Sequence, residues 1–188
     1  MIVVAVVGDS ISAGSPLWDP DPAVRAAIAS PDERSQWQWW ATAREPRLEF
    51  RTRAVYGRRT DEIAAFVDEV VDGAAVLVVQ GGINDVVQGR SVENAARDLA
   101  EMVERGRTLG LPVALADVLP WPRGDVRAAR DIARLNELVH AVPDVIPLRF
   151  HDTLAPLEGW SDDGDHPSVD AHRLLGEEAA RALSELEL

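Results

Sequence analysis

Residues 2–12 read Ile-Val-Val-Ala-Val-Val-Gly-Asp-Ser-Ile-Ser, an apolar run that ends in a glycine and polar residues. Six consecutive apolar residues, most of them valine, are typical of a strand that is buried on both faces, as in a parallel sheet. Comparable short apolar runs recur along the chain and are separated by segments with apolar residues at helical spacing. The predicted strands are 2–7, 48–55, 74–79, 112–119 and 145–148.

The segments between the predicted strands carry helix signals. Thr60 is the expected cap of a helix over 61–70, and Ser91 is the expected cap of a longer one that Gly110 closes. Further helices are expected over 35–44, 132–139 and 168–186. Strands that alternate with helices predict an α/β fold, a three-layer α/β/α sandwich in a single domain spanning 1–188. The connection 10–46 is long and rich in proline, which is typical of a functional loop or lid.

Composition excludes several classes of function. The 188 residues include no cysteine, and all 19 basic residues are arginine, which rules out thiolate nucleophiles, cysteine zinc sites and Schiff-base lysines. A formal net charge of -13 argues against a nucleic-acid partner, because such binding depends on neutralising phosphates. The longest apolar run is too short to span a membrane. No signal-peptide pattern follows Met1, and we therefore expect a cytoplasmic protein.

Polar segments follow the predicted strands where a parallel sheet would bind ligands. Gly8-Asp9-Ser10 follows the first strand, Gly57 the second and Gly82-Ile83-Asn84-Asp85 the third. Asp163-Gly164-Asp165-His166 lies between the fifth strand and the last helix. The carboxyl ends of parallel strands meet at one edge of the sheet, where open α/β folds bind their ligands. The sequence therefore predicts that these four segments converge.

Together these segments contain the groups that acyl transfer needs. A serine hydroxyl becomes a useful nucleophile when an imidazole takes its proton, and a carboxylate orients that imidazole. Ser10, His166 and Asp163 are the candidates for these three roles. The candidate oxyanion donors are the backbone amides of Ser10 and Gly57 and the side-chain amide of Asn84.

These four segments, in this order, resemble the sequence blocks of the SGNH hydrolases, also called GDSL esterases and lipases. The resemblance implies a flavodoxin-like fold with strand order 2-1-3-4-5. It also implies a catalytic triad of Ser10, Asp163 and His166, and an oxyanion hole formed by Ser10, Gly57 and Asn84. The implied activity is hydrolysis of a small-molecule carboxylic ester without a cofactor. Thioester hydrolysis, lysophospholipid cleavage and removal of acetyl groups from carbohydrates remain open within the family.

The second block departs from the family pattern, because Tyr56 stands where a small residue is common. This residue either narrows the site or points away from it.

Other residues near the predicted rim admit more than one interpretation. Trp18, Trp121 and Trp160 fall in loops, and we hypothesise that some of them line an apolar pocket for the acyl or aryl group. Asp162 and Asp165 are expected to be solvated turn residues and not metal ligands, so no metal is predicted. The remaining histidines, which are expected in surface or capping roles, are His140, His151 and His172.

A catalytically silent domain is the alternative from another class of function. One fold hosts many functions, and a flavodoxin-like domain could bind a small ligand or a nucleotide phosphate at residues 10–15. The presence of triad and oxyanion candidates together favours the enzyme, because a binding module does not need the full set.

Overall fold

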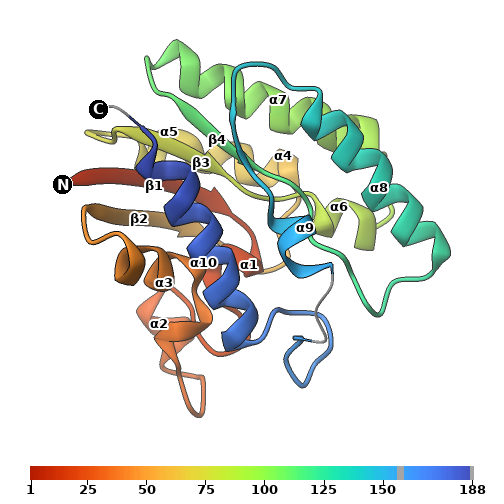
Figure 1. The fold of residues 1–188 in the computed structure, drawn as a ribbon. Coiled ribbons are helices and arrows are strands. Elements are labelled where there is room, and N and C mark those ends of the chain that lie inside the picture. Colours follow the sequence, from red (N-terminus) through yellow and green to blue (C-terminus); the bar gives the residue numbers. More distant parts are fainter. Residues whose placement is uncertain (156–158, 187–188) are drawn as a thin grey trace.

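The computed structural model describes residues 1–155 and 159–186, which form five parallel strands with helices on both sides (Figure 1). The strand order is β2-β1-β3-β4-β5, which confirms the predicted three-layer fold and its order. The strands are β1 (Ile2–Gly8), β2 (Leu48–Ala54), β3 (Val76–Val79), β4 (Val113–Ala116) and β5 (Ile146–Leu148). The third and fourth are shorter than predicted, because the flanking apolar residues belong to the connections.

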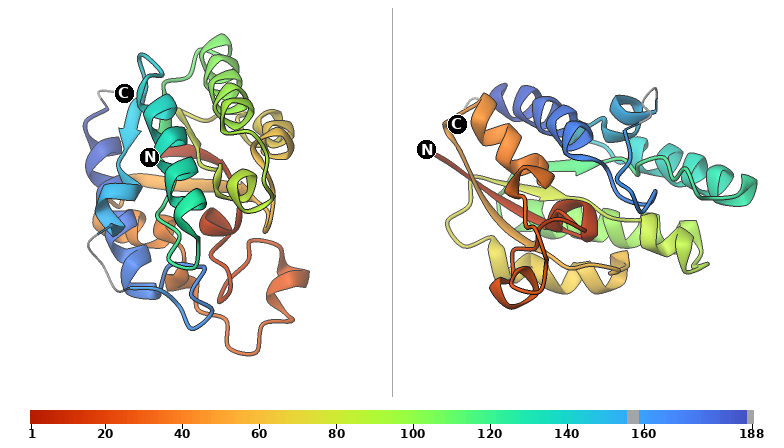
Figure 2. Two further views of the ribbon diagram at one scale, coloured as in Figure 1. Left: turned by 90° about the vertical axis from the view of Figure 1, so that its right-hand side faces the viewer. Right: turned by 90° about the horizontal axis from the view of Figure 1, so that it is seen from below.

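The helices form two layers, with α10 and α3 on one side of the sheet and α7 on the other (Figures 1 and 2). The elements between β1 and β2 are α1 (Ser10–Ala13), α2 (Pro22–Arg25), the 3-10 turn Glu33–Ser35 and α3 (Trp37–Arg44). Those between β2 and β4 are α4 (Thr60–Ile63), the 3-10 turn Ala64–Phe66, α5 (Val67–Val70), α6 (Ile83–Val87) and α7 (Val92–Thr108). The last three are α8 (Val126–His140), α9 (Phe150–Leu154) and α10 (Val169–Ser184).

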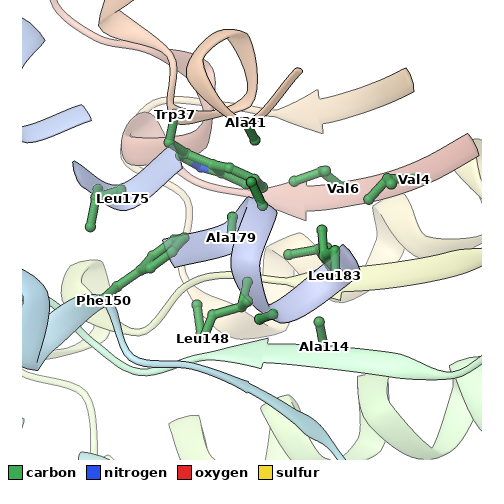
Figure 3. Packing of buried hydrophobic residues seen from close by; sticks show 14 of the residues in the cluster. Val4, Val6, Trp37, Ala41, Ala114, Leu148, Phe150, Leu175, Ala179 and Leu183 are labelled. Carbon is green, nitrogen blue, oxygen red and sulfur yellow. The ribbon is translucent and has the colours of Figure 1, made fainter. Parts of the chain in front are cut away.

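Strand β1 supplies side chains to both cores because successive residues of a strand point to opposite faces. Val4 and Val6 pack with α3 and α10, as Figure 3 shows, whereas Ala5 and Val7 pack with α7. Trp37 is fully buried in the α10 core, and its ring lies edge-on at 5.6 Å from that of Phe150. This two-sided burial explains the continuous apolar run at 2–7.

Two helix predictions need correction. Helix α4 begins at Thr60 and not after it, because Arg59 is the capping residue and its backbone N–H donates to Glu62 Oε2 at 3.1 Å. Thr60 is instead fully buried, with its hydroxyl 3.0 Å from Asp85 Oδ1. The expected single helix over 61–70 is interrupted by the 3-10 turn Ala64–Phe66. The predicted cap at Ser91 is confirmed.

Within residues 1–155 and 159–186, no helix has both the length and the apolar composition needed to cross a membrane.

Candidate active site

Ser10 follows the carboxyl end of β1, which lies between β2 and β3 in the sheet, and it is the first residue of α1. Asp9 caps this short helix, with its Oδ1 accepting the backbone N–H of Ile11 at 3.0 Å. A Cβ at Gly8 would lie 2.7 Å from Gln80 Oε1 and 2.8 Å from the Ser12 side chain, so only glycine fits this turn. Ser10 itself is 5% exposed and is therefore held in a tight, ordered turn.

The side chains of Asp9, Ser12 and Gln80 form a buried polar layer beneath the Ser10 turn. Gln80 Nε2 donates to Asp9 Oδ1 at 3.0 Å, and Ser12 Oγ donates to Gln80 Oε1 at 2.8 Å. Trp37 Nε1 in turn donates to Ser12 Oγ at 3.2 Å. The supporting roles of Gln80 and Ser12 were not predicted from the sequence. A polar residue directly after the apolar run 76–79 was the available signal for Gln80.

Asp9 is fully buried in this layer, and its Oδ2 is without a hydrogen-bond partner among the described residues. Burial raises the pKa of the Asp9 carboxyl to about 6, although the hydrogen bonds from Ile11 and Gln80 and the charge of His166 act in the opposite direction.

His166 and Asp163 form a hydrogen-bonded pair in the turn before α10. His166 Nδ1 lies 2.7 Å from Asp163 Oδ2. The other oxygen, Asp163 Oδ1, accepts bonds from Ser161 Oγ at 2.6 Å, from Asp165 N at 2.8 Å and from His166 N at 3.0 Å. Partial burial alone would raise the pKa of Asp163, but these bonds outweigh it and hold the pKa well below its usual range. The carboxylate therefore stays charged, and Nε2 is the ring nitrogen available for proton transfer.

The turn that carries His166 is anchored on two sides. Trp121 Nε1 donates to Asp165 Oδ1 at 2.8 Å, and Arg123 Nη1 lies 3.2 Å from Asp165 Oδ2. Trp160 pairs with Pro167 in an isolated β-bridge and packs against the α10 core. Asp165, expected to be a solvated turn residue, instead ties the turn to the chain after β4. The sequence offered no signal for Arg123.

Two side-chain amides join the turn at Gly57 to the α6 segment that carries Asn84, the second predicted oxyanion residue. Gly57 follows β2 with a φ of 75°, and its carbonyl accepts a bond from Gln88 Nε2 at 2.9 Å. Asn84 Nδ2 donates to the carbonyl of Arg58 at 3.1 Å. An amide carries two N–H donors, so this bond leaves Asn84 a second hydrogen for a ligand. Gln88 is a supporting residue that the sequence analysis did not identify.

The Gly57 turn and the His166 turn approach each other at the carboxyl edge. The ring of Tyr56, which is 66% exposed, has its centroid 5.9 Å from that of His166. The end of β2 is joined to β1 by the bond from Val55 N to Gly8 O at 3.1 Å. Tyr56 therefore borders the predicted site and does not point away from it. It also lines a surface hollow of about 690 Å³, called here the Tyr56 hollow.

The three loop tryptophans do not line one hollow among the described residues. Trp121 and Trp160 hold the His166 turn, whereas Trp18 lines a different hollow beside α3, together with Trp39. The hypothesis that some of them contact an acyl or aryl group stays a prediction.

The other histidines lie outside the Asp163–His166 pair. His140 Nε2, at the end of α8, lies 3.0 Å from Asp117 Oδ2, and the backbone N–H of His151 donates to Asp117 Oδ1 at 2.6 Å. His172 was expected in a surface or capping role, and this was wrong, because it lies on the buried face of α10 and is completely buried. Burial, and to a smaller extent the charge of His166, lowers the pKa of His172 to about 3. It is therefore a neutral core residue.

Comparison with known proteins identifies the family of the chain. The family model described as GDSL-like Lipase/Acylhydrolase family matches residues 6–174. No curated protein matches the sequence.

Among solved structures, a member of the lipolytic protein G-D-S-L family from Veillonella parvula superposes with a TM-score of 0.81 at 16% identity, covering 99% of this chain and 100% of that one. TesA has a TM-score of 0.77 at 22% identity, covering 96% of this chain and 97% of that chain. The lipase/acylhydrolase from Enterococcus faecalis has a TM-score of 0.76 at 16% identity, with coverages of 97% and 95%. At these identities the superpositions demonstrate a shared fold, while the family model covers nearly the whole chain. The chain therefore belongs to the GDSL-like lipase/acylhydrolase family.

Proposed function

We propose that this protein is a serine esterase that hydrolyses carboxylic esters with small or medium acyl chains through an acyl-enzyme intermediate. The observation that carries the proposal is the 2.7 Å bond between His166 and Asp163, in a turn whose His166 ring lies 5.9 Å from the ring of Tyr56 at the end of β2. An imidazole whose Nδ1 is bonded to a charged carboxylate has a fixed tautomer and can accept a proton at Nε2.

In the first step, Ser10 Oγ attacks the carbonyl carbon of the ester while its proton moves to His166 Nε2. The negative charge that develops on the carbonyl oxygen is stabilised by the amides of Ser10, Gly57 and Asn84. The alkoxide then leaves and takes the proton from His166 Nε2, so the alcohol departs neutral and Ser10 keeps the acyl group. Asp163 remains ionised throughout and stabilises the imidazolium.

In the second step, a water molecule takes the place of Ser10 as the nucleophile. The water oxygen attacks the acyl carbon while His166 Nε2 takes a proton from the water. That proton then moves to Ser10 Oγ as the acid is released. Every step uses side chains of this chain, and the protonation states of Ser10 and His166 are restored at the end of the cycle.

The proposal is tested by initial rates on p-nitrophenyl acetate, butyrate, octanoate and dodecanoate. We expect hydrolysis that depends on Ser10, with an optimum at the shorter chains. Ser10→Ala should remove it, while the matched surface variant Ser30→Ala should leave it unchanged, because Ser30 is exposed and lies in the first crossover. A fluorophosphonate probe should label the wild type at Ser10. Equal rates in wild type and Ser10→Ala on all four esters, with no labelling of Ser10, would overturn the proposal.

A further inference from the structure

The two segments that carry Gly57 and Asn84 start from strands that are not neighbours in the sheet. Gly57 follows β2 and Asn84 follows β3, and β1 lies between these two strands. Adjacent strands are about 4.8 Å apart, so the ends of β2 and β3 are separated by about 10 Å. Among the described residues, no backbone hydrogen bond joins 57–60 to 83–90. The spacing of the two segments therefore depends on side chains.

A cluster of charged and polar side chains joins these segments in the interior. Thr60 belongs to the first segment, Asp85 and Arg90 belong to the second, and Asp98 lies on α7; these four residues are called here the Arg90 clamp. Thr60 and Asp85 are fully buried, and the side chains of Asp98 and Arg90 are 8% and 20% exposed. Figure 1 shows the helices that carry or flank them, α4, α6 and α7, on one side of the sheet.

The polar atoms of the Arg90 clamp lie within hydrogen-bond distance of one another. Arg90 Nη1 is 2.7 Å from Asp85 Oδ1 and 2.7 Å from Asp98 Oδ2. The same nitrogen lies 2.9 Å from Thr60 Oγ1. Asp85 Oδ2, the other oxygen of that carboxylate, accepts the backbone N–H of Thr60 at 2.9 Å. The guanidinium thus holds two carboxylates together, and one of them is bonded to the backbone of the Gly57 segment.

Arg90 supplies the positive charge of this cluster. Partial burial would lower the pKa of the guanidinium, but its hydrogen bonds to Asp85 and Asp98 outweigh this effect and raise the pKa above its usual range. In the described part of the chain, Arg90 is the only cation within 4 Å of Asp85, whereas Asp98 also lies 3.3 Å from the exposed Arg97. A neutral side chain at position 90 would leave Asp85 buried beside a second carboxylate and without a cation.

Two further bridges between the segments lie at the surface. Asn84 Nδ2 donates to Arg58 O, and Gln88 Nε2 donates to Gly57 O, and both hydrogen bonds are exposed. Water can replace a partner in an exposed bond. In the buried cluster it cannot, and a buried charge that loses its partner is strongly destabilising. The Arg90 clamp is therefore the bridge that can fix the spacing of the two segments.

We propose that Arg90 is a positioning residue that sets the distance between Gly57 and Asn84, on either side of β1, and thereby assembles the oxyanion hole. It acts through Asp85 and Thr60, and its role is to place the donors and not to donate to the oxyanion itself. Oxyanion donors act because they are placed in advance, and a displacement of about 1 Å can cost about 100-fold in rate. This role in catalysis rests on the esterase function proposed above, whereas the ordering of the two segments does not.

Arg90→Met is the first test, because methionine keeps part of the length of the side chain and removes its charge. We expect kcat on p-nitrophenyl butyrate to fall about 100-fold, with KM changed less than about threefold, because the donors act in the transition state. Arg90→Lys keeps the charge and should recover part of the loss. Arg105→Met is the matched control. Arg105 Nη2 lies 2.8 Å from Asp68 Oδ1 and joins α7 to α5, but this pair is exposed, so kcat should not change.

Thr60 offers a test with less risk to the fold. Thr60→Val keeps the shape of the side chain and removes the hydroxyl, whereas Thr60→Ser keeps the hydroxyl. Both variants retain the backbone bond to Asp85. We expect kcat to fall about tenfold in Thr60→Val and less than about threefold in Thr60→Ser. Equal kcat in the two variants would overturn the proposal, even if Arg90→Met did not fold.

A double-mutant cycle asks whether Arg90 acts through the oxyanion hole. If it does, Arg90→Met should lower kcat by less than about tenfold in the Asn84→Ala background, because one of the donors that it places is already missing. The same loss of about 100-fold in both backgrounds would show that Arg90 acts elsewhere, and would overturn the proposal.

Hydrogen exchange measures the ordering of the two segments without any activity. We expect the amides of residues 57–60 and 84–88 to exchange at least about tenfold faster in Arg90→Met than in wild type. The amides of β1 should stay protected, which would show that the fold is intact. Unchanged exchange at 57–60 and 84–88, or unchanged kcat in Arg90→Met, would overturn the proposal. If the wild type shows no Ser10-dependent hydrolysis, the esterase proposal fails instead, and the exchange rates alone decide whether Arg90 orders the segments.

Discussion

Two carboxylates near the candidate site, Asp163 in the His166 turn and Asp9 in the Ser10 turn, show how burial and hydrogen bonding together decide the charge of a group. Asp163 accepts bonds at both oxygens within the turn 161–166, and its pKa is held well below the usual range. Asp9, in the layer beneath Ser10, accepts bonds at Oδ1 alone, and burial raises its pKa to about 6. Asp9 is fully buried and accepts two bonds, whereas Asp163 is only partly buried and accepts four, so both burial and the number of donors favour the charged form of Asp163.

The contrast extends beyond these two residues. Among residues 1–155 and 159–186, the buried side-chain atoms that have no hydrogen-bond partner belong to Asp9, Gln38 and His172. Asp9 and Gln38 lie around α1, Gln38 donating to Ser12 O, whereas His172 lies on α10. Both oxygens of Asp163 in the His166 turn are hydrogen-bonded, whereas the layer around Ser10 contains buried polar atoms without partners. Unsatisfied groups of this kind in a native structure require an explanation, and a binding role is one.

The largest expected effect comes from replacing Asp163, the carboxylate that is hydrogen-bonded at both oxygens. Asp163→Asn keeps the shape of the turn but replaces the anionic acceptor at His166 Nδ1, and favours the wrong tautomer. By analogy with other serine hydrolases, kcat/KM should fall by about 10⁴-fold. The measurement is kcat/KM on p-nitrophenyl butyrate at pH 8. Asp165→Asn, two residues away, is the matched control and should cost less than tenfold, because Asp165 positions the turn through Trp121. Equal losses in the two variants would contradict the triad assignment.

Removing one oxyanion donor should have the next largest effect. Asn84→Ala deletes the amide that faces the Gly57 turn, and the loss of one such donor typically lowers kcat by about 100- to 1000-fold. Gln88→Ala is the control, since Gln88 also supports Gly57 by a side-chain amide but is an exposed residue at the C-terminal end of α6. We expect Asn84→Ala to lower kcat with little change in KM, and Gln88→Ala to change kcat less than tenfold. If Gln88→Ala lowers kcat as much as Asn84→Ala, Asn84 acts only by holding the turn.

The sequence predicted the Asp163–His166 pair better than the polar layer beneath Ser10. Strand β1, Ser10 and the Asp163–His166 pair are encoded locally, by an apolar run and by residues three apart in one turn. The layer beneath Ser10 depends on Gln80, which lies about seventy residues from Asp9 along the chain and reaches it only through strand pairing. The wrong placement of His172 has the same origin, because helical spacing did not reveal that α3 covers that face of α10.

Asp9→Asn should change the pH dependence of stability. The folded pKa of about 6 lies above the value of 3.8 for an unperturbed aspartate, so the folded state holds the proton more tightly. The contribution of Asp9 to stability is therefore lost as pH rises from about 4 to about 6. The two pKa values differ by about two units, which corresponds to about 3 kcal/mol at most. Urea unfolding should show that the free energy of unfolding of Asp9→Asn, taken relative to wild type, is about 2 to 3 kcal/mol greater at pH 7 than at pH 4. A constant difference would show that Asp9 is charged in the folded protein at both pH values.

His172→Leu should act in the opposite direction across nearly the same range. The folded pKa of about 3 lies below the 6.5 of an unperturbed histidine, so the folded state excludes the proton, and stability is lost as pH falls below about 6.5. A pH of 5 lies about 1.5 units below the pKa of the histidine in the unfolded chain. Protonation of the unfolded state then lowers the free energy of unfolding of the wild type by about 2 kcal/mol, and leucine avoids this loss. The stability of His172→Leu relative to wild type should therefore be greater at pH 5 than at pH 8 by about 2 kcal/mol.

Because Asp9 and His172 oppose each other between pH 4 and 6, the free energy of unfolding of the wild type should change little with pH there. Each single variant should show the pH dependence that the other residue had offset. A shallow profile in all three proteins would mean that water reaches both Asp9 and His172 and that neither side chain is desolvated.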